Sequence, residues 1–186
     1  MIKNILAAGL SGERNITHSL TQPLIHLALL FPVISLLILV SCSGRNKDTY
    51  GDEEEKRLIE KTIRTSIGWA ASKDLALLYS VIANDSGYLE VHPGITVVKG
   101  FAEFKKQERL WMSPDFKAIG YNLKDLKIEL SQSRTVAWWY GVLNDYSSWK
   151  GAPANWENTR WTGVLEKRNG NWVIVQMHFS FAVNRS

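Results

Sequence analysis

The alternation of hydrophobic and polar residues is clearest near the C-terminus of the chain. Two runs rich in Trp, Val and Ile, residues 160–167 and 172–181, flank an Asn-Gly pair at 169–170. An Asn-Gly pair readily adopts the positive φ angles of a tight turn, so the pattern predicts a β-hairpin. Alternation then divides the second strand into two faces, and we expect the face with Gln176 and His178 to line a partly polar cavity. That face carries Trp172, Ile174, Gln176, His178 and Ser180, and the opposite face carries Val173, Val175, Met177, Phe179 and Phe181.

Apolar residues at helical spacing precede these strands. Isoleucines recur every four residues behind an Asp-x-x-Glu capping box, which predicts a helix over residues 53–71. Asp74 can cap a second, shorter helix over residues 75–82, because its carboxylate accepts hydrogen bonds from free backbone N–H groups. Aromatic residues at helical spacing predict a third helix over residues 101–111, which the Ser-Pro pair at 113–114 ends.

Strand patterns occupy most of the remaining chain. Residues 88–92 and 95–98 flank a Pro-Gly turn and predict two short strands. Residues 116–130 and 134–146 predict two long strands, and residues 147–158 predict a loop before the final hairpin. This order of elements predicts an α+β fold, in which helices cover one face of an antiparallel sheet.

The N-terminal segment differs from everything after it. Residues 24–40 are almost entirely apolar, but the run is shorter than the roughly 20 residues that span a bilayer. It ends in Leu39-Val40-Ser41-Cys42, which resembles the lipobox of a bacterial lipoprotein. The resemblance implies cleavage before Cys42 and attachment of lipid to that cysteine. A transmembrane anchor that ends at Ser41 is the alternative.

These patterns divide the chain into three parts. We expect a lipoprotein signal peptide at residues 1–41, a polar linker at 42–51 and one folded domain at 52–186. Under either interpretation of the N-terminal segment the domain is tethered to a membrane. The expected location is the bacterial cell envelope, in the periplasm or at the outer membrane, with the lipid at Cys42 as the anchor.

Composition narrows the classes of function. A net charge of +4 is small for 186 residues and is scattered along the chain, which argues against nucleic-acid binding. The single cysteine, Cys42, excludes an internal disulfide and a cysteine-based metal site. The histidines show no metal-ligand spacing, and no glycine-rich loop suits a phosphate. We therefore expect no metal, no cofactor and no nucleic-acid partner.

The order of elements and one C-terminal pattern resemble a known family. Gly100 precedes the third predicted helix, and Arg160-x-Thr162 is followed by Gly170-x-Trp172-x-Ile174-x-x-x-His178-x-Ser180. This arrangement resembles the nuclear transport factor 2-like superfamily, and within it the SnoaL-like group. The resemblance covers about residues 52–183. It implies a cone-shaped, cystatin-like fold: a curved antiparallel sheet wrapped around three helices, with a pocket inside. It also implies a homodimer formed through the outer face of the sheet.

The resemblance places two candidate catalytic residues on the last strands. The family's pocket-facing histidine falls on His178, and its pocket-facing arginine falls on Arg160. His178 could act as a general acid or base, or it could be a buried neutral histidine. Arg160 could bind a carboxylate or phosphate through its planar guanidinium, or it could pair with Glu166 or be an exposed charge at the edge of the sheet. Gln176 stands where relatives with a His-x-His pattern have their first histidine, which weakens any mechanism that needs two imidazoles.

Other side chains are expected to shape the pocket wall. Trp138 and Tyr140 share one face of their strand and Trp139 takes the other, so one set lines the pocket and the other packs at an interface. We assign the pocket side to Trp138 and Tyr140. The expected ligand-pocket residues are Gln176, Trp138, Tyr140, Thr162 and Tyr88.

Two acidic residues admit two readings each. Glu90 shares a face with Tyr88 and could add a carboxylate to the pocket mouth, although an outward, solvated Glu90 is the favoured interpretation. Asp85 sits where several enzymes of the superfamily keep a catalytic acid. The sequence Asn-Asp-Ser-Gly at 84–87 is also ordinary turn chemistry, and we favour the turn.

Three functions remain open at this point. The leading hypothesis is an envelope-anchored domain that binds a small, largely apolar ligand with an acidic or carbonyl group, oriented by Arg160 and His178. The alternative is a cofactor-independent isomerase, dehydratase or cyclase in which His178 moves a proton and Arg160 stabilises negative charge. The third is a non-catalytic dimeric assembly module. The sequence identifies neither a ligand nor a reaction.

Overall fold

The computed structural model describes residues 49–182. The predicted signal peptide, Cys42 and most of the predicted linker lie outside these residues. The first described helix begins at Thr49, so the helix starts before the predicted end of the linker at residue 51. None of the described helices is both long enough and apolar enough to cross a membrane.

The helices occupy the places that the apolar spacing predicts. Helix α2 spans Thr49–Gly68 and continues into a 3₁₀ turn, η1, at Trp69–Ala71. Helix α3 spans Leu75–Val81, and the Asp74 carboxylate accepts a hydrogen bond from the backbone N–H of Leu77 at 2.9 Å, which confirms the predicted cap. The predicted third helix is divided in two, α4 at Phe101–Lys105 and α5 at Glu108–Trp111.

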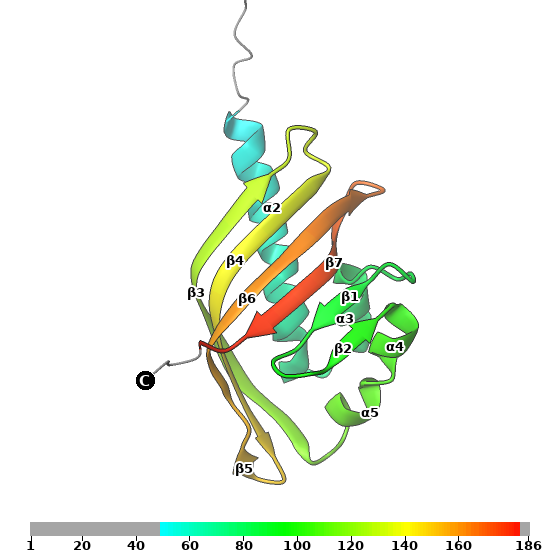
Figure 1. Cartoon of the computed structure of the whole chain (residues 1–186), viewed down its shortest axis with the longest axis vertical. Helices are drawn as coiled ribbons and strands as arrows, with labels where there is room; N and C mark the ends of the chain where they lie inside the picture. Colours follow the sequence, from blue (N-terminus) through cyan, green and yellow to red (C-terminus); the bar gives the residue numbers. More distant parts are fainter. Residues whose placement is uncertain (1–48, 183–186) are drawn as a thin grey trace, which may run out of the picture. The chain divides into compact units, whose positions relative to one another are not determined.

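One seven-stranded sheet forms the other layer. Its strands are β1 Leu89–Val91, β2 Val97–Lys99, β3 Phe116–Leu130, β4 Val136–Trp149, β5 Ala152–Pro153, β6 Trp156–Arg168 and β7 Asn171–Ser180. The order is β2-β1-β7-β6-β4-β3, with β5 paired to β4, and Figure 1 shows these strands side by side. All pairings are antiparallel except that of β1 with β7, so the sheet is mixed.

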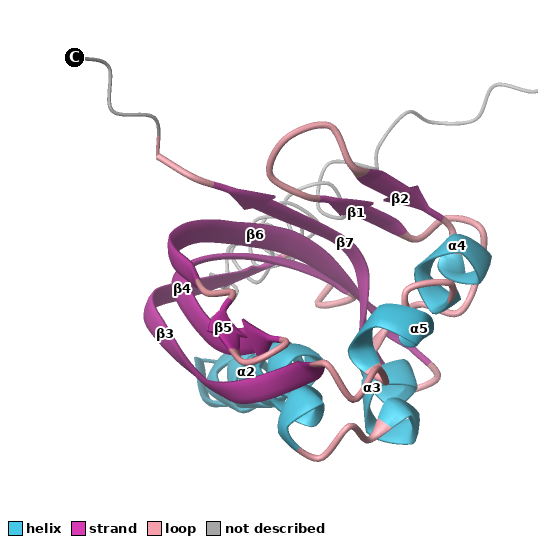
Figure 2. Cartoon of the chain, turned by 90° about the horizontal axis from the view of Figure 1, so that it is seen from below, coloured by secondary structure: helices cyan, strands magenta, loops and turns pink. Residues whose placement is uncertain are grey.

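The sheet curls around the helices, and the expected α+β cone is confirmed. Figure 2 shows that the strands curve and that the helices lie on their concave side. Helix α2 packs against β3 and β7, and α3 packs against α2 and β7. Most of the core side chains that the strands contribute therefore point to the concave face. Its buried side chains are Leu123, Ala137, Trp139, Leu143, Trp161, Leu165, Trp172, Ile174, Met177 and Phe179.

The predicted hairpin of β6 and β7 is present and contains one irregularity. Asn169 and Gly170 both have positive φ, as a tight primed turn requires. Val164 pairs with Gln176, but Leu165 pairs with Ile174, so Val175 is an extra residue on β7. Such a β-bulge shifts the alternation by one position, and side chains beyond it change faces. Trp172 and Ile174 face the core before the bulge, and Met177 and Phe179 face it afterwards.

A glycine decides which face of β4 is buried. Trp139 is 2% exposed, and the residue paired with it on β6 is Gly163. A Cβ at Gly163 would lie 2.1 Å from Cη2 of Trp139, so only glycine leaves room for this indole on the concave face. Trp138 and Tyr140 consequently point outward.

The predicted loop over residues 147–158 is mostly strand. β4 continues to Trp149, β5 pairs back onto it, and β6 begins at Trp156. Lys150 and Gly151 both have positive φ, which closes a tight turn between β4 and β5. Trp149 and Ala154, on either side of this turn, lie on the concave side of the sheet.

Candidate functional site

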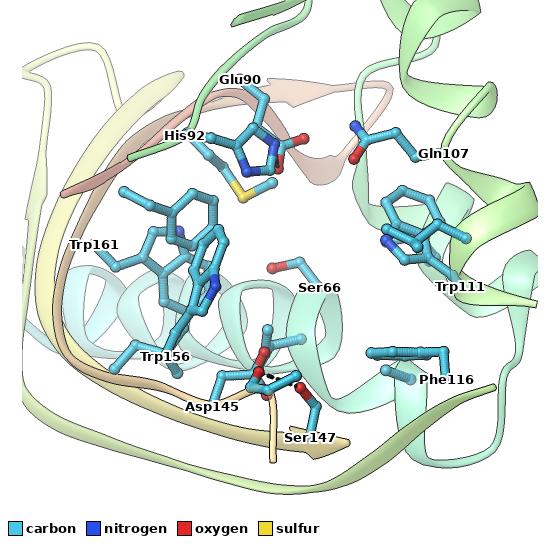
Figure 3. A pocket seen from close by; sticks show the side chains of 18 of the residues that line it. Ser66, Glu90, His92, Gln107, Trp111, Phe116, Asp145, Ser147, Trp156 and Trp161 are labelled. Carbon is cyan, nitrogen blue, oxygen red and sulfur yellow. Dashed lines mark hydrogen bonds and ion pairs between the residues drawn. The ribbon is translucent and has the colours of Figure 1, made fainter. Parts of the chain in front are cut away.

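A cavity of about 540 Å³ opens on the concave side of the sheet. It lies between the C-terminal end of α2 with η1, the segment of α4 and α5, strand β1, and the concave faces of β4, β6 and β7. Figure 3 shows its wall from close by. The volume is within the range of about 300–1,000 Å³ that is typical of small-molecule sites.

Aromatic rings make up most of the apolar wall. Trp161 stacks on Phe179 with ring centroids 5.5 Å apart, and Trp156 meets Phe179 edge-on at the same distance. On the other side, Trp111 packs edge-on against Trp69 at 5.4 Å. Rings that brace one another lose little freedom when a ligand arrives, so these walls are preorganised. The aromatic lining residues are Trp69, Phe104, Trp111, Phe116, Trp149, Trp156, Trp161 and Phe179.

Strand β1 and the residues that flank it supply one polar group of the wall. The hydroxyl of buried Tyr88 donates to Oε2 of Glu90 at 3.0 Å, and Glu90 is only 5% exposed. Burial, and then the neighbouring Glu90 carboxylate, raise the pKa of Tyr88, so its phenol stays protonated. Nε2 of His92 lies 3.1 Å from Oε1 of Glu90, which is ion-pair distance, although the angle is not that of a hydrogen bond.

Strand β4 supplies a carboxyl group on the opposite side of the cavity. β1 and β4 are separated by β7 and β6 in the sheet, and Figure 3 shows Asp145 across the cavity from Glu90 and His92. Among residues 49–182, no hydrogen bond or ion pair holds the Asp145 carboxyl. Burial without a compensating partner raises its pKa from the ordinary 3.8 to about 6. Asp145 can therefore change its charge close to neutral pH.

Two hydrogen-bond donors in the wall also lack protein acceptors. They are Nε2 of Gln107 and Nε1 of Trp161, both on side chains that line the cavity. The hydroxyls of Ser66 and Ser147, by contrast, donate to the backbone carbonyls of Ile63 and Ala154. A ligand could donate to Asp145, whereas the N–H groups of Gln107 and Trp161 lie buried in the wall. In the described part of the chain, no group of three or more His, Cys, Asp and Glu side chains is placed to hold a metal.

The predicted catalytic residues lie on the other side of the sheet. His178 and Arg160 are exposed on its convex face, and Nη2 of Arg160 donates to the carbonyl of Phe181 at 2.7 Å. Neither residue lines the cavity, so the expectation that they face it is corrected. For His178 the cause is the bulge at Val175, which reverses the faces of the last residues of β7. Arg160 follows the alternation of β6, in which the buried Trp161 takes the concave side.

The predicted pocket residues share this correction. Trp138 and Tyr140 are 48% and 38% exposed, and Thr162 and Gln176 face the same convex side. Register aligns Tyr140 with Thr162, and Thr162 with His178, so the structure does bring this set together, but on the convex face. The remaining one, Tyr88, is buried behind Glu90 and does not line the cavity.

The structure decides between the two interpretations given for each of Glu90 and Asp85. Glu90 is buried and lines the cavity, so the favoured interpretation of an outward, solvated Glu90 is wrong. Asp85 accepts a hydrogen bond from the backbone N–H of Gly87 at 2.7 Å and forms an ion pair with Arg168. That ion pair and the turn hold the pKa of Asp85 below its usual value, and the turn interpretation is confirmed.

Sequence reasoning missed Asp145 and His92. A usable signal existed for Asp145, because it lies six residues after Trp139 on the same strand and hence on the same face. Choosing the face of Trp139 as the inner one would have brought Asp145 and Ser147 into the cavity. His92 follows a strand of only three residues, where alternation gives almost no guidance.

Comparisons with known proteins agree with this fold. A family model described as a SnoaL-like domain matches residues 59–184. A search of curated proteins by sequence finds no match.

Solved structures with the same fold come from several bacteria. A candidate dehydratase of the NTF2-like family from Streptomyces avermitilis has 17% identity and a TM-score of 0.62, over 71% of this chain and 99% of that one. A candidate scytalone dehydratase from Novosphingobium aromaticivorans has 13% identity and a TM-score of 0.62, over 73% and 89%. A candidate association domain of calcium/calmodulin-dependent kinase II from Exiguobacterium sibiricum has 9% identity and a TM-score of 0.57, over 71% and 95%. At these identities the likeness concerns the fold alone.

Proposed function

The chain belongs to the SnoaL-like domain family, and we propose that its folded domain binds a small, largely apolar molecule in the cavity on the concave side of the sheet. The observation that carries this proposal is the cavity itself, about 540 Å³ of space with a mainly aromatic wall. Small-molecule sites are concave and lined mainly by apolar and aromatic side chains, and this cavity has both features.

A few polar groups would orient that occupant. Asp145 on β4 and the Glu90–His92 pair at β1 border the cavity. They take over the orienting role that the sequence suggested for Arg160 and His178. Because they are few and the wall around them is apolar, each would fix one polar group of the ligand.

Fluorescence of Nile red, an uncharged dye that brightens in apolar sites, tests this proposal. We expect saturable binding of one dye per domain. Ala70 lines the cavity from η1, so Ala70→Phe should occupy part of the space and weaken dye binding about tenfold or more. Trp138→Ala on the convex face is the control and should bind as the wild type does. Circular dichroism checks that both variants fold; equal binding by all three proteins would refute the proposal.

A proton-transfer enzyme, such as a cofactor-independent isomerase, dehydratase or cyclase, is the second candidate. The observation in its favour is that His92 and the Asp145 carboxyl border one cavity from opposite sides. A pKa of about 6 suits Asp145 to give or take a proton near neutral pH. The candidate dehydratases among the similar structures make a dehydration worth testing first. Turnover that Asp145→Asn abolishes while Arg160→Ala leaves it intact would support this function.

A homodimer formed through the convex face is proposed alongside either function. Trp138 and Tyr140 expose apolar area there, beside Val142 and Val164. Burying these side chains against a second copy would remove that area from water. Sedimentation equilibrium should give a dimer for the wild type and a monomer for Trp138→Glu; a monomeric wild type contradicts the proposal.

Anchoring in the bacterial envelope through Cys42 rests on the sequence alone. The lipobox-like Leu39-Val40-Ser41-Cys42 supports it. Mass spectrometry of the membrane-extracted protein should find a mature chain that starts at a lipidated Cys42. A chain that retains residues 1–41 would instead indicate a transmembrane anchor.

A further inference from the structure

We propose that the molecule in this cavity carries a positive charge: an amine, protonated at neutral pH, on an apolar or aromatic body. This inference rests on the proposed binding function and names the class of ligand. It replaces the acidic ligand that the sequence suggested, because the arginine meant to hold an acid, Arg160, lies on the convex face.

The charged residues of the cavity wall are mainly acidic. Of the residues that line it, Glu90 and Asp145 are carboxylic acids, His92 is the one basic side chain, and none is a lysine or arginine. His92 lies against Glu90, so its charge when protonated would be balanced there. Asp145 stands apart from that pair on β4. Whenever Asp145 is ionised, the wall has a negative charge that no described side chain neutralises.

The Asp145 carboxyl lacks a positively charged partner. It is largely removed from water, yet within residues 49–182 no cation or hydrogen-bond donor is bound to it. An ionised carboxylate in such a place is costly unless a positive group reaches it. The raised pKa is the expression of that cost. A ligand ammonium would supply the partner, whereas a ligand carboxylate would add a second uncompensated charge.

The C-terminal end of helix α2 also favours a positively charged ligand. Ser66 and Ile67 line the cavity from its last turn, and Trp69 and Ala70 line it from η1. A helix carries partial negative charge at its C-terminus, where cations are favoured. The last turn of α2 has no basic side chain to offset this charge. The helix end and the ionised Asp145 carboxylate therefore both favour a cation in the cavity.

The aromatic wall suits a cation as well as an apolar body. Trp156 is paired with Asp145 across β6 and β4, so its indole borders the position that an ammonium bound to Asp145 would take. Cations are attracted to the faces of indole rings, most strongly where water is excluded. Lys73 does not supply this cation. Its amine lies 5.9 Å from the ring of Phe116, but it donates to the carbonyl of Ser113 and does not line the cavity.

Three naphthalene compounds with one ring system and different charge test the inference. They are 2-naphthylmethylamine, a cation; 2-naphthylmethanol, which is neutral; and 2-naphthoate, an anion. Calorimetric titration of the wild-type protein at pH 7.5 should give a dissociation constant about tenfold lower for the amine than for the alcohol. The anion should bind more weakly than either.

Each possible outcome decides a different claim. Equal affinities for the amine and the alcohol, or tighter binding of the anion, would overturn the cationic ligand while leaving a binding cavity in place. If none of the three compounds binds and Nile red does not bind either, the proposed function itself fails.

A pair of matched variants locates the effect at one side chain. Asp145→Asn keeps the shape of the group but removes its charge. The preference for the amine, about tenfold in the wild type, should therefore be lost, and the amine and the alcohol should bind equally. Affinity for the alcohol should change little. Glu129→Gln makes the same chemical change on an exposed residue of β3 and should keep the full preference. Loss of the preference in both variants would indicate a general charge effect and overturn the assignment to Asp145.

Discussion

The concave and convex faces of the sheet carry similar residues and differ in their surroundings. Trp139 and Trp138 are neighbours on β4, yet the first is 2% exposed and the second 48% exposed. The concave face meets the helices and borders the cavity with Asp145, while the convex face holds Arg160 and His178 in solvent. Residue type alone thus does not identify the functional face. The packing opposite each side chain decides it.

Truncating one tryptophan on each face is the strongest test of this contrast. Trp161 is 1% exposed, stacks on Phe179 and meets Trp139 edge-on at 5.6 Å. Trp161→Ala should lower the free energy of unfolding by about 3–5 kcal/mol, because it leaves a large void in the core. Trp138→Ala should cost less than about 1 kcal/mol in the monomer. Urea denaturation below the dimerisation concentration measures both; similar losses would contradict the assignment of the faces.

Adding one methyl group sharpens the comparison within a single strand. At Gly163 a Cβ would lie 2.1 Å from the ring of Trp139 and 2.4 Å from the carbonyl oxygen of Gln176. Gly163→Ala should therefore destabilise the domain by about 1–3 kcal/mol or more, since neither the backbone nor the indole can yield freely. Thr162→Ala, the adjacent position on the convex face, should cost under about 1 kcal/mol. A stable Gly163→Ala domain would mean that Trp139 has another place to go.

The pH dependence of stability separates a buried carboxyl from an exposed one. Burial raises the pKa of Asp145 to about 6, so the folded state holds this proton more tightly than the unfolded chain does. Its contribution to stability is complete below about pH 4 and is lost as the pH rises through about 6. Asp145→Asn should be more stable than the wild type at pH 7.5, by about 2 kcal/mol after allowance for solvent screening.

That difference should shrink as the pH falls and should be nearly gone at about pH 3, where the wild-type carboxyl is mostly protonated in both states. Glu129→Gln is the control and should follow the wild-type curve at every pH. Thermal melting of the three proteins between about pH 3 and pH 8 provides the measurement. Parallel curves for the wild type and Asp145→Asn would show that Asp145 is not buried as described.

Local rules were enough for most of the elements, although residues 147–158 form mostly strand where a loop was predicted. The helical spacing of isoleucines, the Asp74 cap and the Asn169-Gly170 turn each depend on a few adjacent residues, and each matches the structure. The order of these elements predicts helices on one face of a sheet, and the resemblance to the SnoaL-like group adds the curvature of that sheet. Predictions of this kind hold because they require no knowledge of what lies opposite a side chain.

The residues of the candidate site could not be predicted from the alternation of apolar and polar residues along each strand. The extra residue Val175 exchanges the faces of β7, and no turn or glycine in β7 marks this bulge. The inner face of β4 is chosen by Gly163 on another strand, through a contact that appears only when β4 and β6 are paired. An error of one position in register places His178 inside instead of outside, which is why the right fold led to the wrong site residues.

The smallest effects are expected where the sequence predicted the largest. His178 is exposed on the convex face, so His178→Ala should change the unfolding free energy by less than about 0.5 kcal/mol and leave the dissociation constant of Nile red unchanged. His92 lines the cavity, lies 6.0 Å from the ring of Phe179 and faces the Glu90 carboxylate. His92→Ala should therefore alter dye binding, because it changes both the shape and the charge of the wall. If His178→Ala impaired binding and His92→Ala did not, the convex face would be the functional one, and the cavity would be a packing defect without an occupant.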